Sequence, residues 1–318
     1  MGVIANQLKL DNARATYTAL GEEVFAGNRV GFAQSFTRTV PVDGTALEID
    51  AMGATPAVQE IVGSRRFASL RAYANRGRVK RWGPDALNIP ILQILNDKND
   101  LIAQQLAAYV RDSASYFDKP AFDFLLSNPT CIDGGALLSS SHSFGAAGGT
   151  WSNLGSALTP STFFTGFAAM EALRLENGEP AGYLPRTFLV GPDLRKVATD
   201  LVTNDRVYPI AAGGVEAYSS DVAATTKSNW LIEGGTPLQV IVAPRITGSG
   251  YSNSWFLIDT SKEMARPVVI GEAISPQTYS VVDPSSFAMV DRSEAIFYAE
   301  GQAAFVGAVP LSIYGYIG

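Results

Sequence analysis

Residues 96–128, NDKNDLIAQQLAAYVRDSASYFDKPAFDFLLSN, contain the clearest helical pattern in the chain. Apolar side chains recur there at helical spacing, at Ile102, Leu106, Val110, Ala114 and Phe117. Asp97 and Asp100 suit the positive N-terminal end of a helix. The spacing predicts a long helix from Asp97 to Ser127, with an interruption before Pro120, because proline disfavours helical geometry in the residue that precedes it.

Downstream of this helix, the pattern alternates and then becomes mostly β. Residues 128–157 are rich in Gly and Ser and predict loops. Thr159-Pro160 predicts a helix start, since threonine caps a helix and proline fits its first position. A strand at 186–190 and a helix at 192–202 follow. Further strands are predicted at 238–242, 255–258, 268–270, 295–298, 303–306 and 311–316. The fold class is therefore α+β.

Upstream, two segments have too few apolar residues for a core of their own. Residues 1–36 form an arm with a short helix over Asp11–Phe25, which Gly21 and Gly27 are expected to break. Residues 37–95 form a long, hairpin-like excursion, and no acid occurs between Glu60 and Asp85. Its basic run consists of Arg65, Arg66, Arg71, Arg76, Arg78, Lys80 and Arg81.

The charge distribution favours self-assembly. The chain has 318 residues, only 17% of them charged, and a net charge of −6, so the chain outside the seven-residue basic run carries −13. We expect the basic excursion of one copy to lie across the acidic body of the next, in contacts that close into rings or shells. Binding of nucleic acid through phosphates and a plain solvated hairpin are the alternatives.

Candidate chemical sites are few. One cysteine and one histidine exclude a disulfide framework, CxxC metal sites and His-rich zinc sites. His142, in SSSHSF, has no GxSxG elbow beside it, and neither it nor Cys131 shows a nucleophile signature. The Gly-rich stretches fit no phosphate-binding motif. We therefore expect no catalytic residue, no cofactor and no metal, and the lack of a long apolar run predicts no membrane span.

Four stretches carry a resemblance to a known family. They are ALLSSSHSF (136–144), NLGSALTPSTF (153–163), ENGEPAGYLPRTFLVGPDLRKVATDLV (176–202) and SEAIFYAEGQAAFVGAVPLSIYG (293–315). Together with the order of arm, excursion, long helix and Gly/Ser loop, they resemble the major capsid protein of tailed bacteriophages with the HK97-type fold. The local sequence looks most like the Mu-type major head subunit branch.

The resemblance implies a role for each segment. Residues 1–36 would be the N-terminal arm, 37–95 the extended E-loop, and 96–157 the peripheral domain with its spine helix. Residues 158–290 would form the axial domain, and 291–318 would return to the peripheral domain. The seven basic residues would be inter-subunit contacts. No enzyme activity is implied, and no Lys–Asn crosslink is predicted for Lys80.

The resemblance also implies partners and a location. Copies of the chain would form hexamers and pentamers of an icosahedral shell, with portal, scaffold and cement proteins as further partners. The shell would enclose double-stranded DNA without sequence-specific binding and would assemble in the host cytoplasm. The alternatives are another virion protein of the tail, baseplate or cement class, a hydrolase that uses His142, or a nucleic-acid-binding module.

Overall fold

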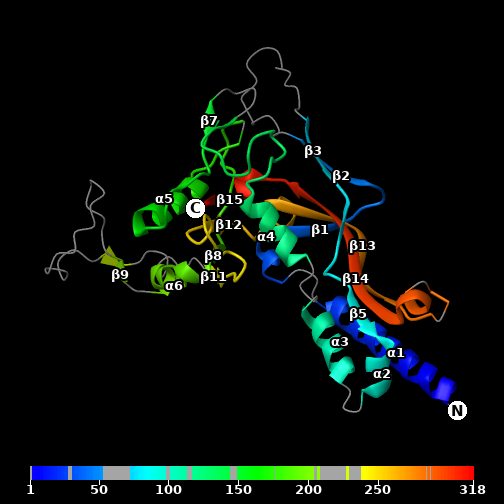
Figure 1. Ribbon diagram of the computed structural model, residues 1–318. Helices are drawn as coiled ribbons and strands as arrows, with labels where there is room; N and C mark the ends of the chain where they lie inside the picture. Colours follow the sequence, from blue (N-terminus) through cyan, green and yellow to red (C-terminus); the bar gives the residue numbers. More distant parts are fainter. Residues whose placement is uncertain are drawn as a thin grey trace.

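Two β-sheets of different construction organise the molecule, and an elongated arm extends from the side of the first (Figure 1). The computed structural model describes residues 2–27, 31–52, 72–97, 101–112, 117–143, 149–175, 177–203, 206–207, 227–228, 238–283, 285–286 and 288–318. Among the described helices, none is long and apolar enough to cross a membrane.

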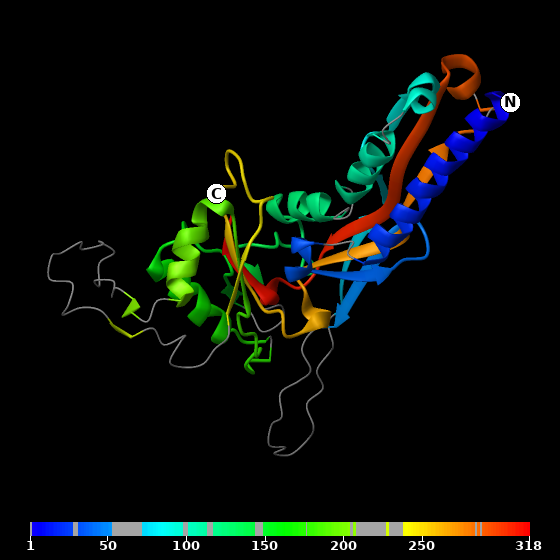
Figure 2. The same cartoon turned by 90° about the horizontal axis from the view of Figure 1, so that it is seen from below.

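The first sheet is built on two long antiparallel strands, β13 (Val268–Val281) and β14 (Glu294–Gly307). The edges are formed by β1 (Thr37–Pro41), parallel to β13, and by β4 (Lys80–Trp82) and β5 (Leu87–Pro90), both antiparallel to β14. The β13–β14 ladder shifts register twice between Glu272 and Gln277. Bulges of this kind bend a strand pair, and the sheet curves out into the arm (Figure 2).

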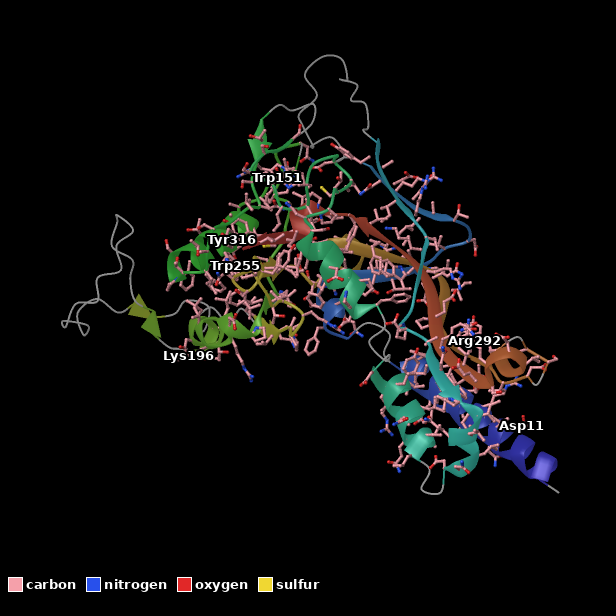
Figure 3. All side chains as sticks on the ribbon, in the orientation of Figure 1. Asp11, Trp151, Lys196, Trp255, Arg292 and Tyr316 are labelled. Carbon is pink, nitrogen blue, oxygen red and sulfur yellow. The ribbon has the colours of Figure 1, made fainter. Side chains whose placement is uncertain are left out.

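The second sheet has the order β11 (Gln239–Val242), β8 (Thr187–Val190), β12 (Trp255–Ile258), β15 (Ile313–Tyr316). Every residue of β8 and β12 is buried, as expected for strands covered on both faces. Helices α5 (Pro160–Glu171) and α6 (Arg195–Thr203) belong to this half. Its core surrounds Trp255, which packs with Phe188 and Tyr314 (Figure 3).

The arm is a three-helix layer on the outer end of β13 and β14. Helix α1 (Gly2–Gly27) runs along β13 and beside α3 (Leu101–Asp112), and α2 (Ile91–Asn96) lies at their outer end (Figure 2). Tyr17, Leu106, Val110 and Phe297 form its buried core. This arm has a hydrophobic cluster separate from those beneath the two sheets.

A hairpin and several short elements complete the described chain. Strands β2 (Ala46–Met52) and β3 (Ala72–Arg78) pair over their whole length. At the base of this hairpin, the buried side chain of Leu47 packs with Val269 and Val306 of the first sheet. Helix α4 (Asp118–Leu126) packs in the central core. The short strands are β6 (His142–Ser143), β7 (Thr150–Trp151), β9 (Arg206–Val207) and β10 (Lys227–Ser228). The short helices are η1 (Phe32–Ser35), η3 (Pro192–Leu194), η5 (Glu263–Ala265), η6 (Ala288–Arg292) and η7 (Pro310–Ser312).

The helix predicted over Asp97–Ser127 is divided. Within the described residues it consists of α3 and α4, and the separate helix α2 precedes it. Asp97 starts α3 by accepting hydrogen bonds from the backbone N–H groups of Leu101 and Ile102. Pro120 lies in the first turn of α4, where its missing N–H costs no helical hydrogen bond.

One other expectation about an element is wrong. Gly21 does not break the N-terminal helix, which continues through it. Within residues 37–95, β1, β4 and β5 pair with the first sheet, and only the β2–β3 hairpin forms a sheet of its own. The predicted boundary at residue 290 lies between β13 and β14, which pair in the first sheet, while β15 joins β12 in the second sheet.

Candidate functional site

The described part of the basic run lies on strands β3 and β4. Arg65, Arg66 and Arg71 lie outside the described residues. Arg76, Arg78 and Lys80 alternate with half-buried residues, so they share the exposed face of the chain. Arg76 forms an ion pair of 3.2 Å with Glu48, its register partner on β2. The structure therefore brings Arg78 and Lys80 together on one surface and pairs Arg76 within its own hairpin.

Arg81 points to a different partner from its neighbours in the run. Its guanidinium donates two hydrogen bonds to the Glu300 carboxylate on β14, one from Nε at 2.7 Å to Oε1 and one from Nη2 to Oε2. This hydrogen bonding lowers the pKa of Glu300 and raises that of Arg81. The pair fastens β4 to the sheet, so the Arg81 charge is already matched inside the subunit.

Arg78 and Lys80 border a hollow with an aromatic floor. It has a volume of about 230 Å³ and lies between β4, α4 and β14. Its lining consists of Arg78, Lys80, Trp82, Pro120, Asp123, Phe124, Ala303 and Phe305. Trp82 is held by a 3.1 Å hydrogen bond from its indole N–H to the Ala303 carbonyl and by an edge contact with Phe305. Two cations beside an apolar hollow are suited to bind a partner surface in which an acidic side chain is flanked by apolar side chains.

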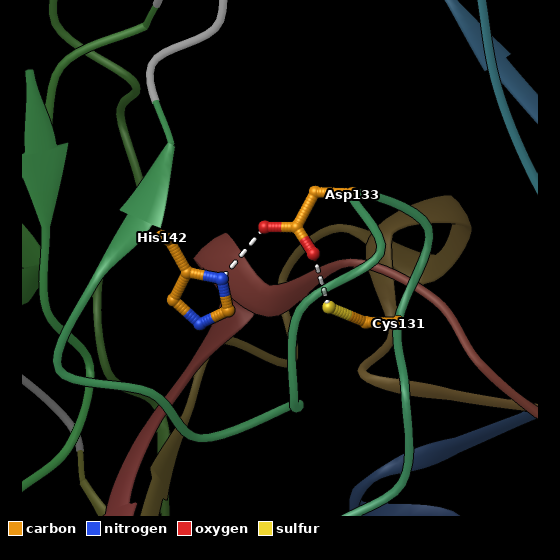
Figure 4. Close-up of side chains that lie close together, drawn as sticks. All are labelled: Cys131, Asp133 and His142. Carbon is orange, nitrogen blue, oxygen red and sulfur yellow. Dashed lines mark hydrogen bonds and ion pairs between the residues drawn. The ribbon is translucent and has the colours of Figure 1, made fainter.

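A second cluster brings together Cys131, Asp133 and His142 in the loop region after α4 (Figure 4). His142 Nδ1 lies 2.6 Å from Asp133 Oδ2, and Cys131 Sγ lies 2.7 Å from Asp133 Oδ1. Cys131 and His142 are both buried, with 1% of their surface exposed. The His142 ring stacks on Trp151 of β7 at 4.5 Å. Cys131 and His142 are therefore both held against the carboxylate of Asp133.

Asn153 fixes the other side of the His142 ring. The Asn153 amide group donates to the carbonyls of Leu137 and Pro310, and its Oδ1 accepts from the Ser139 N–H. Oδ1 is thus an acceptor, and it lies 3.1 Å from His142 Nε2. The hydrogen-bond network assigns a proton to Nε2, since two acceptors would otherwise face each other.

The electrostatics of the cluster exclude an activated thiol. Burial, followed by the neighbouring Asp133, raises the pKa of Cys131 far above its ordinary value. For Asp133, burial opposes ionisation, but hydrogen bonds from His142, Cys131 and the Gly135 N–H outweigh it and lower the pKa to about 2. The carboxylate is therefore charged at neutral pH and the thiol is protonated, which is the reverse of what a cysteine nucleophile requires.

A serine hydrolase arrangement is also absent at His142. Its two ring nitrogens face Asp133 and Asn153, and Ser141 donates its backbone N–H to Ser139 instead. Neither Asp133 nor Asn153 stands out in the sequence as a partner of Cys131 or His142. The spacing Cys-x-Asp before a Gly-Gly turn was the available signal, and the hairpin β6–β7 that returns His142 to it was not evident.

Comparison with known proteins gives one family and a set of similar folds. Residues 89–301, about two thirds of the chain, match the family described as phage capsid protein. No curated protein matches the chain.

Solved structures of phage capsid chains share the fold at low sequence identity. A chain of the bacteriophage JBD30 capsid is 11% identical with a TM-score of 0.50, and the match covers 90% of this chain and 64% of that one. A Microbacterium phage Oxtober96 chain is 12% identical with a TM-score of 0.55, covering 91% of both chains. A Mycobacterium phage Adephagia chain is 12% identical with a TM-score of 0.54, covering 91% and 90%. The predicted α+β, HK97-like fold is confirmed.

Proposed function

This chain belongs to the family of phage capsid proteins and is a structural component of the virion shell, and we propose that it is the major head subunit, whose copies form the hexamers and pentamers of an icosahedral shell around double-stranded DNA. The observation that carries the proposal is the family match over residues 89–301. It spans α3, α4, β13, three of the four strands of the second sheet and the first part of β14, and it includes most of the buried residues of both cores.

Each part of the fold receives a role in this proposal. Residues 1–36 act as the N-terminal arm, and the layer of α3 and α4 on the first sheet acts as the peripheral domain. The α/β half around β8 and β12 acts as the axial domain, which meets its copies around the symmetry axes. Residues 37–95 act as the extended E-loop, and within them the β2–β3 hairpin is the part that does not pair with the first sheet, whereas β1, β4 and β5 do.

The partners follow from the same role. Other copies of the chain are the principal partner, and portal, scaffold and cement proteins complete the head. A net charge of −6 keeps the shell from clamping the genome, because DNA phosphates are repelled by a wall of the same sign. We also propose membership of the Mu-type branch, on the four sequence stretches at 136–144, 153–163, 176–202 and 293–315.

Inter-subunit contact through the basic run is the most testable part of the proposal. We expect Arg78 and Lys80 to receive an acidic surface of a neighbouring copy, with the hollow beside Trp82 taking an adjoining apolar side chain. The charges of Arg76 and Arg81 are matched by Glu48 and Glu300, and Arg65, Arg66 and Arg71, which the proposal also assigns to the contact, lie outside the described residues.

The test is a charge reversal, Arg78→Glu with Lys80→Glu. We expect soluble, folded subunits that form few or no closed shells in negative-stain microscopy, because like charges now face each other across the contact. The matched control is Arg195→Glu with Lys196→Glu on α6, which makes the same charge change on another exposed surface (Figure 3). Normal shells from the hairpin variant would reject the contact, and DNA retention by the wild-type subunit at moderate salt would favour a nucleic-acid-binding module instead.

A further inference from the structure

We propose that Cys131, Asp133 and His142 form a zinc-binding site, with Sγ, a carboxylate oxygen and Nδ1 as ligands. Sulfur, oxygen and nitrogen ligands of these types are those that Zn²⁺ takes in proteins. The three ligand atoms lie within 4.8 Å of one another, and two of the three side chains are buried. The proposal concerns a local site in the subunit and does not depend on how copies assemble.

The outer contacts of His142 already have the form that a metal ligand needs. Nε2 donates to Asn153 Oδ1, whose role as acceptor is fixed by the Ser139 N–H. In the neutral ring, Nδ1 then carries the lone pair and points at the Asp133 carboxylate from 2.6 Å. Two electron-rich atoms at that distance need a cation between them, either a proton or a metal ion. Metal-bound histidines characteristically donate their second ring N–H to an acceptor of this kind.

The other two ligands meet the same requirement. Cys131 Sγ lies 2.7 Å from Asp133 Oδ1, a separation typical of N–H···O bonds although sulfur is the larger atom. The thiol and the imidazole thus both direct a cation at one carboxylate. One Zn²⁺ with a thiolate, a carboxylate and a neutral imidazole has the same total charge as the cluster with its two bridging protons. Replacing the two bridging protons by one Zn²⁺ therefore adds no net charge to the buried site.

The cluster also offers space and a route of entry. A Cβ added at Gly135 would lie 3.3 Å from Asp133 Oδ1 and 3.5 Å from His142 Nδ1, so this glycine keeps an open space beside both ligand atoms. The Asp133 side chain is 15% exposed, whereas that of His142 is fully covered, so an ion enters from the carboxylate side. Zinc there would tie the loop after α4 to the β6–β7 hairpin.

Cobalt binding to the full-length protein, freed of metal with a chelator, gives a direct test. Cys131 is the only cysteine in the chain. A thiolate-to-cobalt charge-transfer band in the near ultraviolet can therefore come from no other residue. We expect this band to appear with Co²⁺, to saturate at one ion per chain, and to disappear when Zn²⁺ displaces the cobalt. Titration without a charge-transfer band would overturn the proposal.

Variants separate the ligands from nearby acids. Cys131→Ser should abolish the band, and Asp133→Asn should weaken zinc binding by more than the roughly tenfold to hundredfold loss typical of an outer contact. Gly135→Ala, which adds a methyl group beside Asp133 Oδ1 and His142 Nδ1 without removing a ligand, should also weaken zinc binding. Asp43→Asn is the control, because it removes an exposed carboxylate with the same charge change. Equal zinc affinity in Asp133→Asn and Asp43→Asn would reject Asp133 as a ligand.

Nitrogen NMR of the wild-type protein decides the matter even if the variants fail to fold. His142 is the only histidine, so its two ring nitrogens give one assignable pair of signals. With zinc, we expect Nδ1 to lose its proton and shift while Nε2 keeps its proton and its bond to Asn153. A spectrum that zinc leaves unchanged would mean that the cluster is bridged by protons alone, and the site would be rejected.

Discussion

Gly21 lies inside α1, where glycine ordinarily weakens a helix, yet the packing requires it. A Cβ at this position would collide with the Oγ1 and Cγ2 atoms of Thr278 on β13. The helix therefore approaches the sheet closely at this point, and the arm owes part of its packing to a residue with no side chain. Local propensity predicts a helix break at this glycine, because propensity gives no sign of the sheet that lies beside it.

Gly21→Ala should consequently destabilise the protein, against the usual trend. Glycine to alanine inside a helix normally stabilises by about 0.5–1 kcal/mol, whereas overpacking here should cost about 1–3 kcal/mol. Urea unfolding of the isolated subunit measures the difference. Adding Thr278→Ala should recover part of the loss, and Ala19→Gly, at an exposed position on the same helix, gives the ordinary propensity effect for comparison. A stabilised Gly21→Ala protein would contradict the close approach.

Asp118 links α4 to η1, the short helix that precedes β1 of the first sheet. Its buried carboxylate accepts hydrogen bonds from the backbone N–H groups of Phe32 at 3.2 Å and Ala33 at 2.9 Å. Asp118→Ala should cost about 1.5–3 kcal/mol, the range for hydrogen bonds to a charged group, and should accelerate exchange of the Ala33 amide proton. Asp123→Ala, on the exposed side of the same helix, loses only a surface ion pair with Lys119 and should cost about 0–1 kcal/mol. Equal losses in the two variants would refute this role.

Among the elements, α5 has the clearest start signal in the sequence, a capping threonine followed by a proline. Thr159 accepts a hydrogen bond from the Thr162 N–H, and the Thr162 hydroxyl oxygen accepts one from the Thr159 N–H. Thr159→Ala should lower the free energy of unfolding by about 1 kcal/mol, measured by denaturant titration of the subunit. Thr159→Ser keeps the hydroxyl and should be nearly neutral. A serine variant as unstable as the alanine variant would mean that the methyl group, not the cap, matters.

Elements whose signals are local were predicted, and those defined by distant partners were not. The helix at Pro160 and strand β8 appear where capping and periodicity predict them, and the helix predicted at 192–202 is present as η3 followed by α6. Strand β14 was predicted as two pieces because Gly301 interrupts the apolar pattern. The strand continues through Gly301, which pairs with Trp82 of β4 and lies close to Pro276 of β13. Only the first three residues of β13 were predicted, since its bulges spoil the alternation on which such predictions depend.

The same distinction separates the two candidate sites. The basic run was evident because charge can be counted along the chain, although its ion pairs with Glu48 and Glu300 depend on strand register. The cluster of Cys131, Asp133 and His142 depends on the return of the β6–β7 hairpin, and Asn153 completes it only in three dimensions. The residues of that cluster can be seen in the sequence, but their spacing does not show that they meet in the folded chain.

At the scale of the whole molecule, the described chain exposes several large apolar side chains that an isolated subunit does not need. Three of them, Leu92 of α2, Leu101 of α3 and Val290 of η6, are 71%, 55% and 70% exposed, and α2 and η6 both lie toward the outer end of the arm in Figure 2. Large exposed apolar side chains on one extremity of a molecule are typical of surfaces that contact a partner. The shape thus favours a subunit that is completed by its copies.

The β2–β3 hairpin allows this dependence to be tested without damage to the body. Met52 and Ala72 are the last register partners of the ladder, so residues 53–71 can be replaced by Asn-Gly, the preferred two-residue hairpin turn. The shortened chain retains Leu47, with its buried contacts, and the Asn75 hydrogen bonds to Thr130 and Gly307. It should therefore remain folded, with a melting temperature close to that of the wild type.

If residues 53–71 reach a neighbouring copy, the shortened chain should remain a soluble subunit under conditions in which the wild type forms shells. Light scattering and negative-stain microscopy measure this outcome. Mixing it with wild-type chains should lower the yield of shells in proportion to its share, because each copy incorporated interrupts a ring of contacts. Closed particles built from the shortened chain alone would show that assembly depends on the arm and the α/β half, and the extended loop would lose its proposed role.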